Sequence, residues 1–410
     1  MDNKNTQKML LLINGLKIIL TIFTSTFFTS YIVALNKSNI FGAGIINVGS
    51  FYLSQYLIYI LTYLLLSRFV AKSNRVNFLR LAIIINGLLL ISLVFFGNYL
   101  LNWIFLAGAL IGVSDAFYNS SYLVMKNEVV KKKNINNFNI KVSVLTNLIN
   151  IIIPIILGYL IDLTTFNYIA IYVIVIVVFQ LIFSFFISPY RPKLPKFKLK
   201  EFCLYLKNNA EDRSKLKWNY LNLFFAGFKN TYKVLIVILT IYVFETNFSL
   251  GILTSIFSII TTILLIIFKK FEYHKKMNKL LVFMIVSILP IILCVLFIIL
   301  QNSLILIALN FSLTLAIQLS EYASNSSRDA IIKCLNKYEY IVEHQFLSEA
   351  FMCLSRILSY TIFIIVGLFQ NITLFTILLI ILISLNPIKF YFMYKLETVR
   401  ENLSKELNNI

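Results

Sequence analysis

The chain has 410 residues, of which 59% are hydrophobic, and its mean hydropathy is +0.85. Soluble domains contain about 45–50% apolar residues, so this composition excludes an ordinary soluble globular protein. A formal net charge of +20 would suit a nucleic-acid-binding protein, but the basic residues lie between long apolar runs, and we expect no nucleic-acid partner.

Apolar runs of about 20 residues recur along the whole chain, and each is long enough to cross a hydrocarbon core about 30 Å thick. A transmembrane β-barrel would instead show shorter segments of alternating polarity. The expected fold class is therefore an all-α polytopic membrane protein. Its twelve predicted helices lie near residues 10–35, 41–67, 76–97, 99–124, 142–163, 165–189, 217–244, 249–268, 279–300, 303–327, 345–369 and 372–390.

The longest polar stretch lies between the sixth and seventh predicted helices. It contains Pro189, Pro192 and Pro195, which interrupt any continuous helix. We therefore expect an N-terminal six-helix half at 1–189, a cytoplasmic linker at 190–216 and a C-terminal six-helix half at 217–410.

A short polar sequence occurs once in each half. The run from Asp115 to Ser121 reads DAFYNSS, and the run from Glu321 to Ser327 reads EYASNSS, 206 positions later (321 − 115). A second match, Gly15-Leu16-Lys17 with Gly227-Phe228-Lys229, has an offset of 212 (227 − 15). Two matches in the same order predict two pseudo-symmetric halves made by duplication, a recurrent transporter architecture.

The basic residues gather in alternate loops, which fixes the expected orientation by the positive-inside rule. We expect both termini in the cytoplasm, and the abundance of Asn, Ile and Lys suggests a bacterial plasma membrane. The predicted outward loops carry Lys37 and little else. The predicted inward loops carry Arg68, Lys72, Arg75, Arg80, Lys126, Lys131 to Lys133, Arg191, Lys193, Lys196, Lys198, Lys200, Lys269, Lys270, Lys275, Lys276, Lys333 and Lys337.

Two groups of residues match family signatures. Arg68, Lys72 and Arg75 occupy the loop after the second helix, where the signature Gly-x-x-x-Asp-Arg-x-Gly-Arg-Arg is expected; its Gly and Asp are absent here. Pro154 and Gly158 retain part of the Gly-Pro-x-x-Gly-Gly element of the fifth helix. With its two six-helix halves, the sequence resembles the major facilitator superfamily, and the stretch Glu339-Tyr340-Ile341-Val342 resembles uncharacterised bacterial members. This resemblance implies alternating access, with helices one, four, seven and ten lining a central cavity.

Each copy of the repeated sequence places a carboxylate within a polar stripe on one helix face. Ionisable groups are costly in a membrane, so a function is expected for them. Asp115 and Glu321 could couple transport to protons, pair with basic residues such as Arg75 and Lys276 to latch a cytoplasmic gate, or form a static packing network. The stripes contain Gly108, Gly112, Asp115 and Asn119 in one half, and Thr314, Gln318, Glu321, Asn325 and Arg328 in the other.

Lys229 and Lys233 lie one turn apart in the seventh predicted helix, and Lys17 occupies the matching place in the first. They would attract an anionic group of a substrate. Alternatively, Lys17 extends to the inner surface and Lys229 pairs with Glu321, leaving no free positive charge.

Glu349 and Arg356 share one face of the eleventh predicted helix and could join Arg328 in a charge network, while Arg68 is a further gate candidate. Five hydroxyl residues of the first helix could line a water path or satisfy the backbone. They are Thr21, Thr24, Ser25, Thr26 and Thr29.

No pattern in the sequence predicts an enzyme, a metal site or a cofactor. The two histidines have no catalytic or metal-ligating partner at suitable spacing, the four cysteines form no C-x-x-C pair, and no phosphate-binding loop for ATP occurs. We expect a monomeric secondary transporter in the lipid bilayer, exporting a small molecule or peptide with a coupling proton or ion. The alternatives are a flippase for lipid-linked saccharides and a membrane scaffold or sensor.

Overall fold

A computed structural model describes residues 3–69, 74–130, 135–188, 197–273, 279–333 and 340–408. The described residues are almost entirely helical and contain no strand. Twelve of their helical segments are long and apolar enough to cross a membrane, which confirms the predicted fold class.

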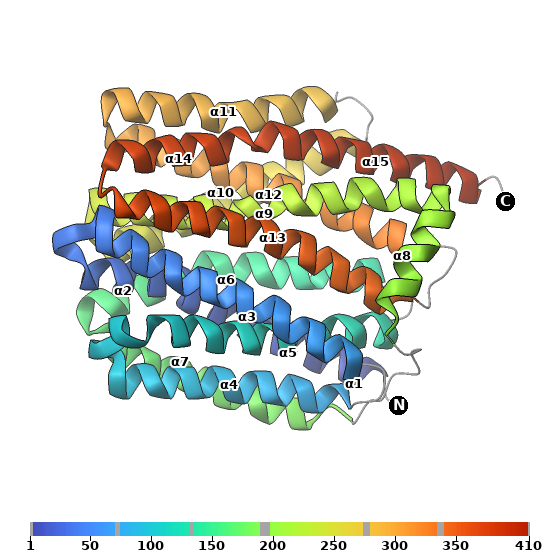
Figure 1. Cartoon of the computed structure of the whole chain (residues 1–410), viewed down its shortest axis with the longest axis horizontal. Coiled ribbons are helices and arrows are strands. Elements are labelled where there is room, and N and C mark those ends of the chain that lie inside the picture. The colour runs from blue at the N-terminus through green and yellow to red at the C-terminus, as the bar shows by residue number, and fades with distance from the viewer. Residues whose placement is uncertain are drawn as a thin grey trace. The chain divides into compact units, whose positions relative to one another are not determined.

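The first half of the chain contains α1 to α7 (Figure 1). Short π-helical and 3-10 segments interrupt the regular helices near α2 and before α5. The bounds are α1 Asn3–Ile22, α2 Phe28–Leu35, α3 Ile45–Phe69, α4 Arg75–Phe96, α5 Ile104–Val129, α6 Ile135–Leu163 and α7 Phe166–Phe185.

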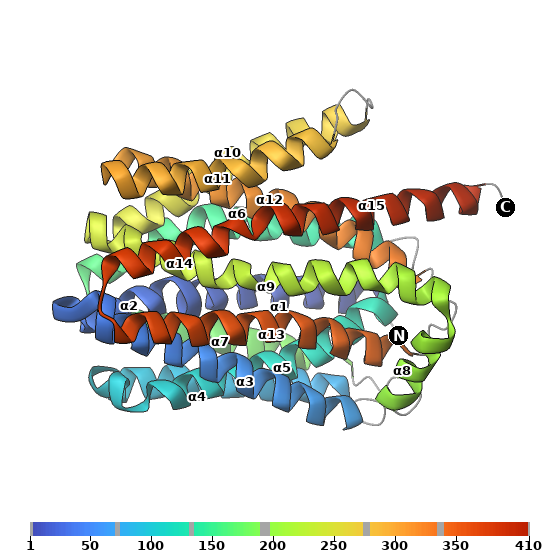
Figure 2. The same cartoon turned by 45° about the horizontal axis from the view of Figure 1, so that its top comes forward.

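The second half contains α9 to α15, preceded by the short helix α8 (Figure 2). The final membrane segment is divided into α14 and α15 at Leu385. The bounds are α8 Leu199–Asn208, α9 Ala210–Phe244, α10 Asn247–Tyr273, α11 Lys279–Leu300, α12 Ser303–Lys333, α13 Ile341–Leu368, α14 Ile372–Ser384 and α15 Asn386–Asn408.

The outward-facing surfaces of the helices are apolar. On α6, for example, Leu148, Ile152 and Ile156 are each about half exposed, at 51%, 51% and 45%. Such a surface is unfavourable in water and suits contact with lipid tails.

The chain forms two compact units that do not coincide with the two halves of the sequence. Unit 1 contains 1–194 with 237–258 and 360–370, and unit 2 contains 195–236, 259–359 and 371–410. Because this division cuts α9, α10 and α13 partway along, the boundaries expected at 189 and 217 stay a prediction.

Small residues bring helix backbones together within each unit. In unit 1, a Cβ atom added at Gly108 of α5 would lie 2.1 Å from the carbonyl oxygen of Phe51 in α3. In unit 2, a Cβ atom at Gly227 of α9 would lie 2.4 Å from the carbonyl oxygen of Met352 in α13. Only glycine permits such close crossings, which are typical of packed membrane helices.

The predicted linker contains the short helix α8. Phe202 of α8 is 1% exposed and packs with Leu216, Tyr220 and Leu396 of unit 2. The hydroxyl of Tyr205 donates a hydrogen bond to Asp212. Burial and this carboxylate raise the pKa of Tyr205 to about 12, so the hydroxyl stays protonated. The prolines and charges of the linker predict a loop at 190–216. The structure instead contains the helix α8 in this stretch, and the apolar face of α8 packs on unit 2.

Candidate functional site

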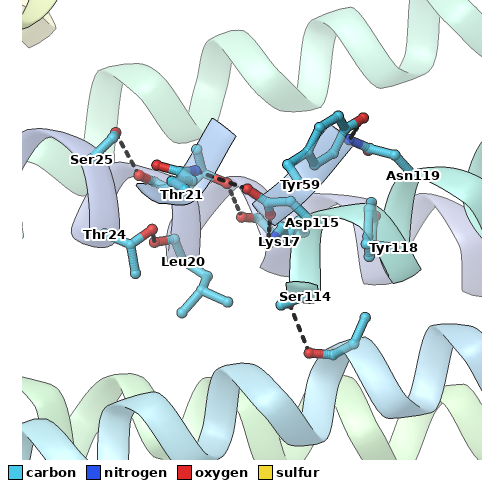
Figure 3. A network of polar contacts seen from close by, with 12 residues as sticks. Lys17, Leu20, Thr21, Thr24, Ser25, Tyr59, Ser114, Asp115, Tyr118 and Asn119 are labelled. Atoms are coloured by element: carbon cyan, nitrogen blue, oxygen red, sulfur yellow. Dashed lines mark hydrogen bonds and ion pairs between the residues drawn. The ribbon is translucent and has the colours of Figure 1, made fainter. Parts of the chain in front are cut away.

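The first repeated carboxylate forms an ion pair with the first intramembrane lysine (Figure 3). Lys17 Nζ of α1 lies 2.8 Å from Asp115 Oδ1 of α5, and the two side chains are 13% and 24% exposed. Gln55 Nε2 of α3 donates to the other oxygen of Asp115 at 3.1 Å. The charges of this first-half pair balance one to one.

The backbone of α5 determines where this carboxylate lies. A Cβ atom at Gly112 would lie 2.3 Å from the carbonyl oxygen of Gln55, so α5 packs directly on the α3 backbone at this point. One turn beyond Asp115, Asn119 Nδ2 donates to the hydroxyl of Tyr59 in α3 at 3.2 Å (Figure 3). The glycines of the predicted stripe thus serve helix packing, and its polar residues contact α3.

The hydroxyl residues of the first membrane helix bond to their own backbone. Thr21, Thr24 and Ser25 each donate to the carbonyl oxygen four residues earlier (Figure 3), and Thr29 does the same. Phe23–Phe27 adopts a π-helical turn in the same region. Of the two expected roles, the structure shows backbone satisfaction, and such bonds often bend a helix.

The second half contains the matching ion pair. Lys229 of α9 bonds through Nζ to Glu321 Oε1 of α12. Lys17 and Lys229 come from one repeated sequence, and Asp115 and Glu321 come from the other. The two matches found separately in the sequence are therefore partners in space, once in each half.

The surroundings of the second pair differ, because two further lysines interact electrostatically with Glu321. They are Lys233, one turn after Lys229, and Lys389 of α15. Lys389 is 4% exposed and donates to the hydroxyl of Ser320 at 2.6 Å. We call Lys229, Lys233, Glu321 and Lys389 the second-half cluster; its formal charge is +2, from three lysines and one carboxylate.

Part of the second-half cluster is accessible to solvent. The side chain of Glu321 is 46% exposed, and Lys233 is also exposed. Contact of a charged side chain with lipid tails costs free energy. The side chains of Glu321 and Lys233 both interact electrostatically with Lys389, which is 4% exposed, so the cluster extends from the surface of unit 2 into its interior.

A separate carboxylate joins the two halves inside unit 1. Asp162, near the end of α6, accepts the backbone N–H of Asn247 through Oδ1 at 3.1 Å and that of Phe248 through Oδ2 at 2.8 Å. It thereby caps the N-terminus of α10, where an anion is favoured. Close by, Gly158 and Gly251 place α6 and α10 in backbone contact.

The remaining predicted site residues have varied environments. Arg68 is exposed, and Arg75 is fully buried, but the ion-pair partner of Asp115 is Lys17 and not Arg75. Gln318 is partly buried, and its Oε1 has no hydrogen-bond partner. Glu349 and Arg356 both interact with the thiol of Cys353, which lies between them on α13. The side chains of Lys276, Asn325 and Arg328 lie outside the described part of the structure.

The profile of the Major Facilitator Superfamily matches residues 18–329. The chain belongs to this superfamily. The match spans most of both halves and makes the protein a membrane transporter, which confirms the predicted family and the general function. A comparison with curated proteins finds no match.

Solved structures of transporters share the superfamily fold. A POT family transporter in complex with a thioalcohol-conjugated peptide is 11% identical, with a TM-score of 0.70 and 96% of each chain covered. A bacterial homologue of the iron transporter ferroportin in an inward-facing state is 13% identical, with a TM-score of 0.67 and 96% and 98% covered. A bacterial homologue of the human lysosomal transporter Spinster, inward-facing and unoccupied, is 11% identical, with a TM-score of 0.59 and the same coverage. At these identities the similarity shows the fold alone.

Sequence reasoning missed three polar residues that the structure places at these sites. Each forms a hydrogen bond with a residue far away in the sequence. The separations are 60 positions for Gln55, 85 for Asp162 and 69 for Lys389. Lys389 lies at the edge of the last predicted helix and reads there as a boundary residue. The feature of the sequence that could have identified Lys389 as a site residue is its position within a strongly apolar run.

Proposed function

We propose that this superfamily member is a secondary active transporter that works by alternating access and exports a small molecule or peptide. The observation that carries the proposal is the repeated lysine–carboxylate pair, Lys17 with Asp115 and Lys229 with Glu321. Such pairs are costly within a membrane, and their repetition in both halves is expected where each half moves as a transport element. The positive-inside pattern supports cytoplasmic termini, and the abundance of Asn, Ile and Lys supports a bacterial plasma membrane.

Of the three roles considered for the carboxylates, coupling or substrate recognition is best supported for Glu321. Its side chain is 46% exposed, so protons and solutes can reach it. A proton that neutralised Glu321 would release Lys229 and change the charge of the cluster, linking proton movement to substrate binding. For Asp115, with a compensating lysine and an amide donor, we propose a packing role.

The polar contacts within unit 1 support an inward-facing resting state. The α6–α10 contact at Asp162 and the stacking of Tyr52 in α3 on Tyr360 in α13, with ring centroids 4.9 Å apart, join the ends of these helices that are predicted to face outward. Two of the similar solved structures are also inward-facing. In this proposal, opening to the outside requires these contacts to separate.

The test is transport by the purified full chain in proteoliposomes. Liposomes preloaded with a bacterial metabolite extract are incubated with and without a proton gradient, and the released solutes are identified by mass spectrometry. We expect at least one solute to leave faster than from protein-free liposomes, and we expect Glu321→Gln to abolish the effect of the gradient. Glu211→Gln, which breaks an exposed ion pair with Lys215 on α9, is the matched control and should behave as the wild type.

Two results would contradict the proposal in different ways. Release that depends on the gradient equally in Glu321→Gln and the wild type would remove the coupling role of Glu321. No protein-dependent flux in either direction, for any solute, would contradict a transporter of soluble compounds and favour a scaffold, a sensor or a lipid flippase.

A further inference from the structure

The second-half cluster contains more positive charge than its carboxylate can balance. Glu321 is ion-paired with Lys229 and has Lys233 and Lys389 within electrostatic range. With Lys229 and Glu321 cancelling each other, two ammonium groups remain. In the first half, Asp115 balances Lys17, and the position that matches Lys233 is Thr21 (233 − 212 = 21).

Neither remaining ammonium group forms an ion pair or a hydrogen bond with a carboxylate among the described residues. Lys389 is 4% exposed, and its hydrogen bond goes to the neutral hydroxyl of Ser320. Lys233 forms no hydrogen bond or ion pair with any described residue, and it is exposed. A lysine ammonium group has three donors and no acceptor, so both side chains can still donate to an anion.

A third donor lies beside Lys389 without a partner. Asn386, one turn earlier on α15, is 3% exposed, and its buried Nδ2 has no hydrogen-bond partner among the described residues. Its Oδ1 accepts from the hydroxyl of Tyr232, which is adjacent to Lys233 and interacts electrostatically with Glu321. This bond fixes the amide so that its donor side is the free one. A buried donor without an acceptor is costly and is expected where a ligand supplies the acceptor.

We propose that Lys233, Lys389 and Asn386 bind the anionic group of the transported compound, a carboxylate or a phosphate. This inference rests on the proposed transport function and specifies its substrate class as organic anions. Negative oxygens supply acceptors for all three donors and reduce the excess charge, and charge-assisted hydrogen bonds of this kind are among the strong ones in proteins. Lys17 and Lys229, paired with carboxylates in this structure, do not contact the anion.

Binding to the purified full chain in detergent tests the site independently of transport. The probes are succinate for carboxylates and inorganic phosphate for phosphates, at constant ionic strength, with succinamide and 1,4-diaminobutane as neutral and cationic controls. We expect at least one anion to raise the unfolding temperature in a saturable manner, and the two controls to have no effect. Stabilisation by succinate alone identifies a carboxylate ligand, and stabilisation by phosphate alone a phosphate ligand.

Variants then locate the binding. Lys233→Gln should weaken anion binding at least about tenfold, corresponding to about 1.4 kcal/mol. Lys389→Gln should have a similar effect, and Lys233→Arg should retain most of the binding. Lys207→Gln, on the exposed surface of α8, is the matched control and should bind as the wild type. Because Lys389 is buried and its variant could unfold, exposed Lys233 provides the decisive comparison.

The inference is wrong if no anion stabilises the wild type, if Lys233→Gln binds anions as tightly as the wild type, or if the diamine stabilises instead. Its failure differs from failure of the transport proposal. Transport that continues without any anion binding refutes the anion site alone. Anion binding that depends on Lys233, without any flux, refutes the transport proposal alone.

Discussion

The two lysine–carboxylate pairs have the same origin in the repeated sequence but different surroundings. In the first half, Asp115 balances Lys17 and also accepts from Gln55 at 3.1 Å. In the second half, Glu321 faces three lysines and is more exposed, at 46% against 24%. The two copies of the repeated sequence thus share a central ion pair and differ in the charge around it.

This difference indicates which copy has been adapted to a ligand. A balanced pair with low exposure contributes packing and orientation, since a satisfied buried pair adds little net stability over apolar residues. An unbalanced, accessible cluster remains costly unless something else supplies negative charge. The comparison of the two copies can be tested by substitutions at matching positions.

The largest effect is expected from removing the carboxylates. Removing one partner of a fully buried pair costs about 3–5 kcal/mol, and partial exposure reduces this cost. We expect about 2–3 kcal/mol for Glu321→Gln, which leaves three like charges together, and about 1–2 kcal/mol for Asp115→Asn. Unfolding temperatures of the purified variants measure the difference, with Glu211→Gln as an exposed control. Equal losses would show that the two copies are electrostatically equivalent.

Removing the lysines should reverse the order of the two halves. Lys17→Gln leaves Asp115 with Gln55 as its remaining donor, and we expect a loss of about 2 kcal/mol. Lys229→Gln leaves Glu321 within range of Lys233 and Lys389, so about 1 kcal/mol or less is expected. The same unfolding measurement applies. A larger loss for Lys229→Gln would mean that Lys233 and Lys389 do not compensate Glu321.

Substitution of Asp162 should change the balance between inward-facing and outward-open conformations. Asp162→Ala removes the acceptors for the first N–H groups of α10, and loss of such a cap costs about 0.5–2 kcal/mol. A cost of about 1–2 kcal/mol shifts a two-state population about 5–30-fold. Distances between spin labels at Ser38 and Glu245, in a cysteine-free background, should show more of the outward-open state. Asp162→Asn, which keeps one acceptor, should lie between alanine and the wild type.

The smallest effect is expected at Gln55. Its Nε2 donates to Asp115, but its Oε1 is buried without a partner. Gln55→Leu removes the hydrogen bond and the unsatisfied oxygen together, so the two contributions nearly cancel, and the loss should stay below about 1 kcal/mol. Gln55→Glu, which adds a second carboxylate, should destabilise more. A loss above 2 kcal/mol for the leucine variant would show that the amide is essential to the first-half pair.

The sequence was sufficient for the fold and for the four residues of the two ion pairs, but it did not decide how they pair. Runs of apolar residues have a length set by the bilayer, so the twelve membrane helices could be predicted from local composition. The repeat identified Lys17, Asp115, Lys229 and Glu321 as matching residues. The pairing of Lys229 with Glu321 was one of two alternatives, because spacing along the chain does not determine which helices are neighbours.

The remaining residues depend on contacts between distant helices. Lys389 donates a hydrogen bond to Ser320, 69 positions away, and Asn386 accepts one from Tyr232, 154 positions away. In the sequence, Asp162 is simply a residue at a helix end. Only the structure shows that the N-terminus of α10 lies beside it and donates to it. Likewise, Asp115 pairs with Lys17 of α1, whereas Arg75 was one of the partners considered from the sequence, and nothing in the local sequence ranks the two.

The close contact between α3 and α5 has a mechanical consequence. Gly108 and Gly112 lock the two backbones together, so Gln55 and Asp115 must move as one part. Lys17 belongs to α1, and a π-helical turn follows this helix, beginning six residues after Lys17 at Phe23. The distance from Lys17 Nζ to Asp115 Oδ1 is 2.8 Å in this state. It should therefore change whenever α1 moves relative to the packed pair of helices α3 and α5.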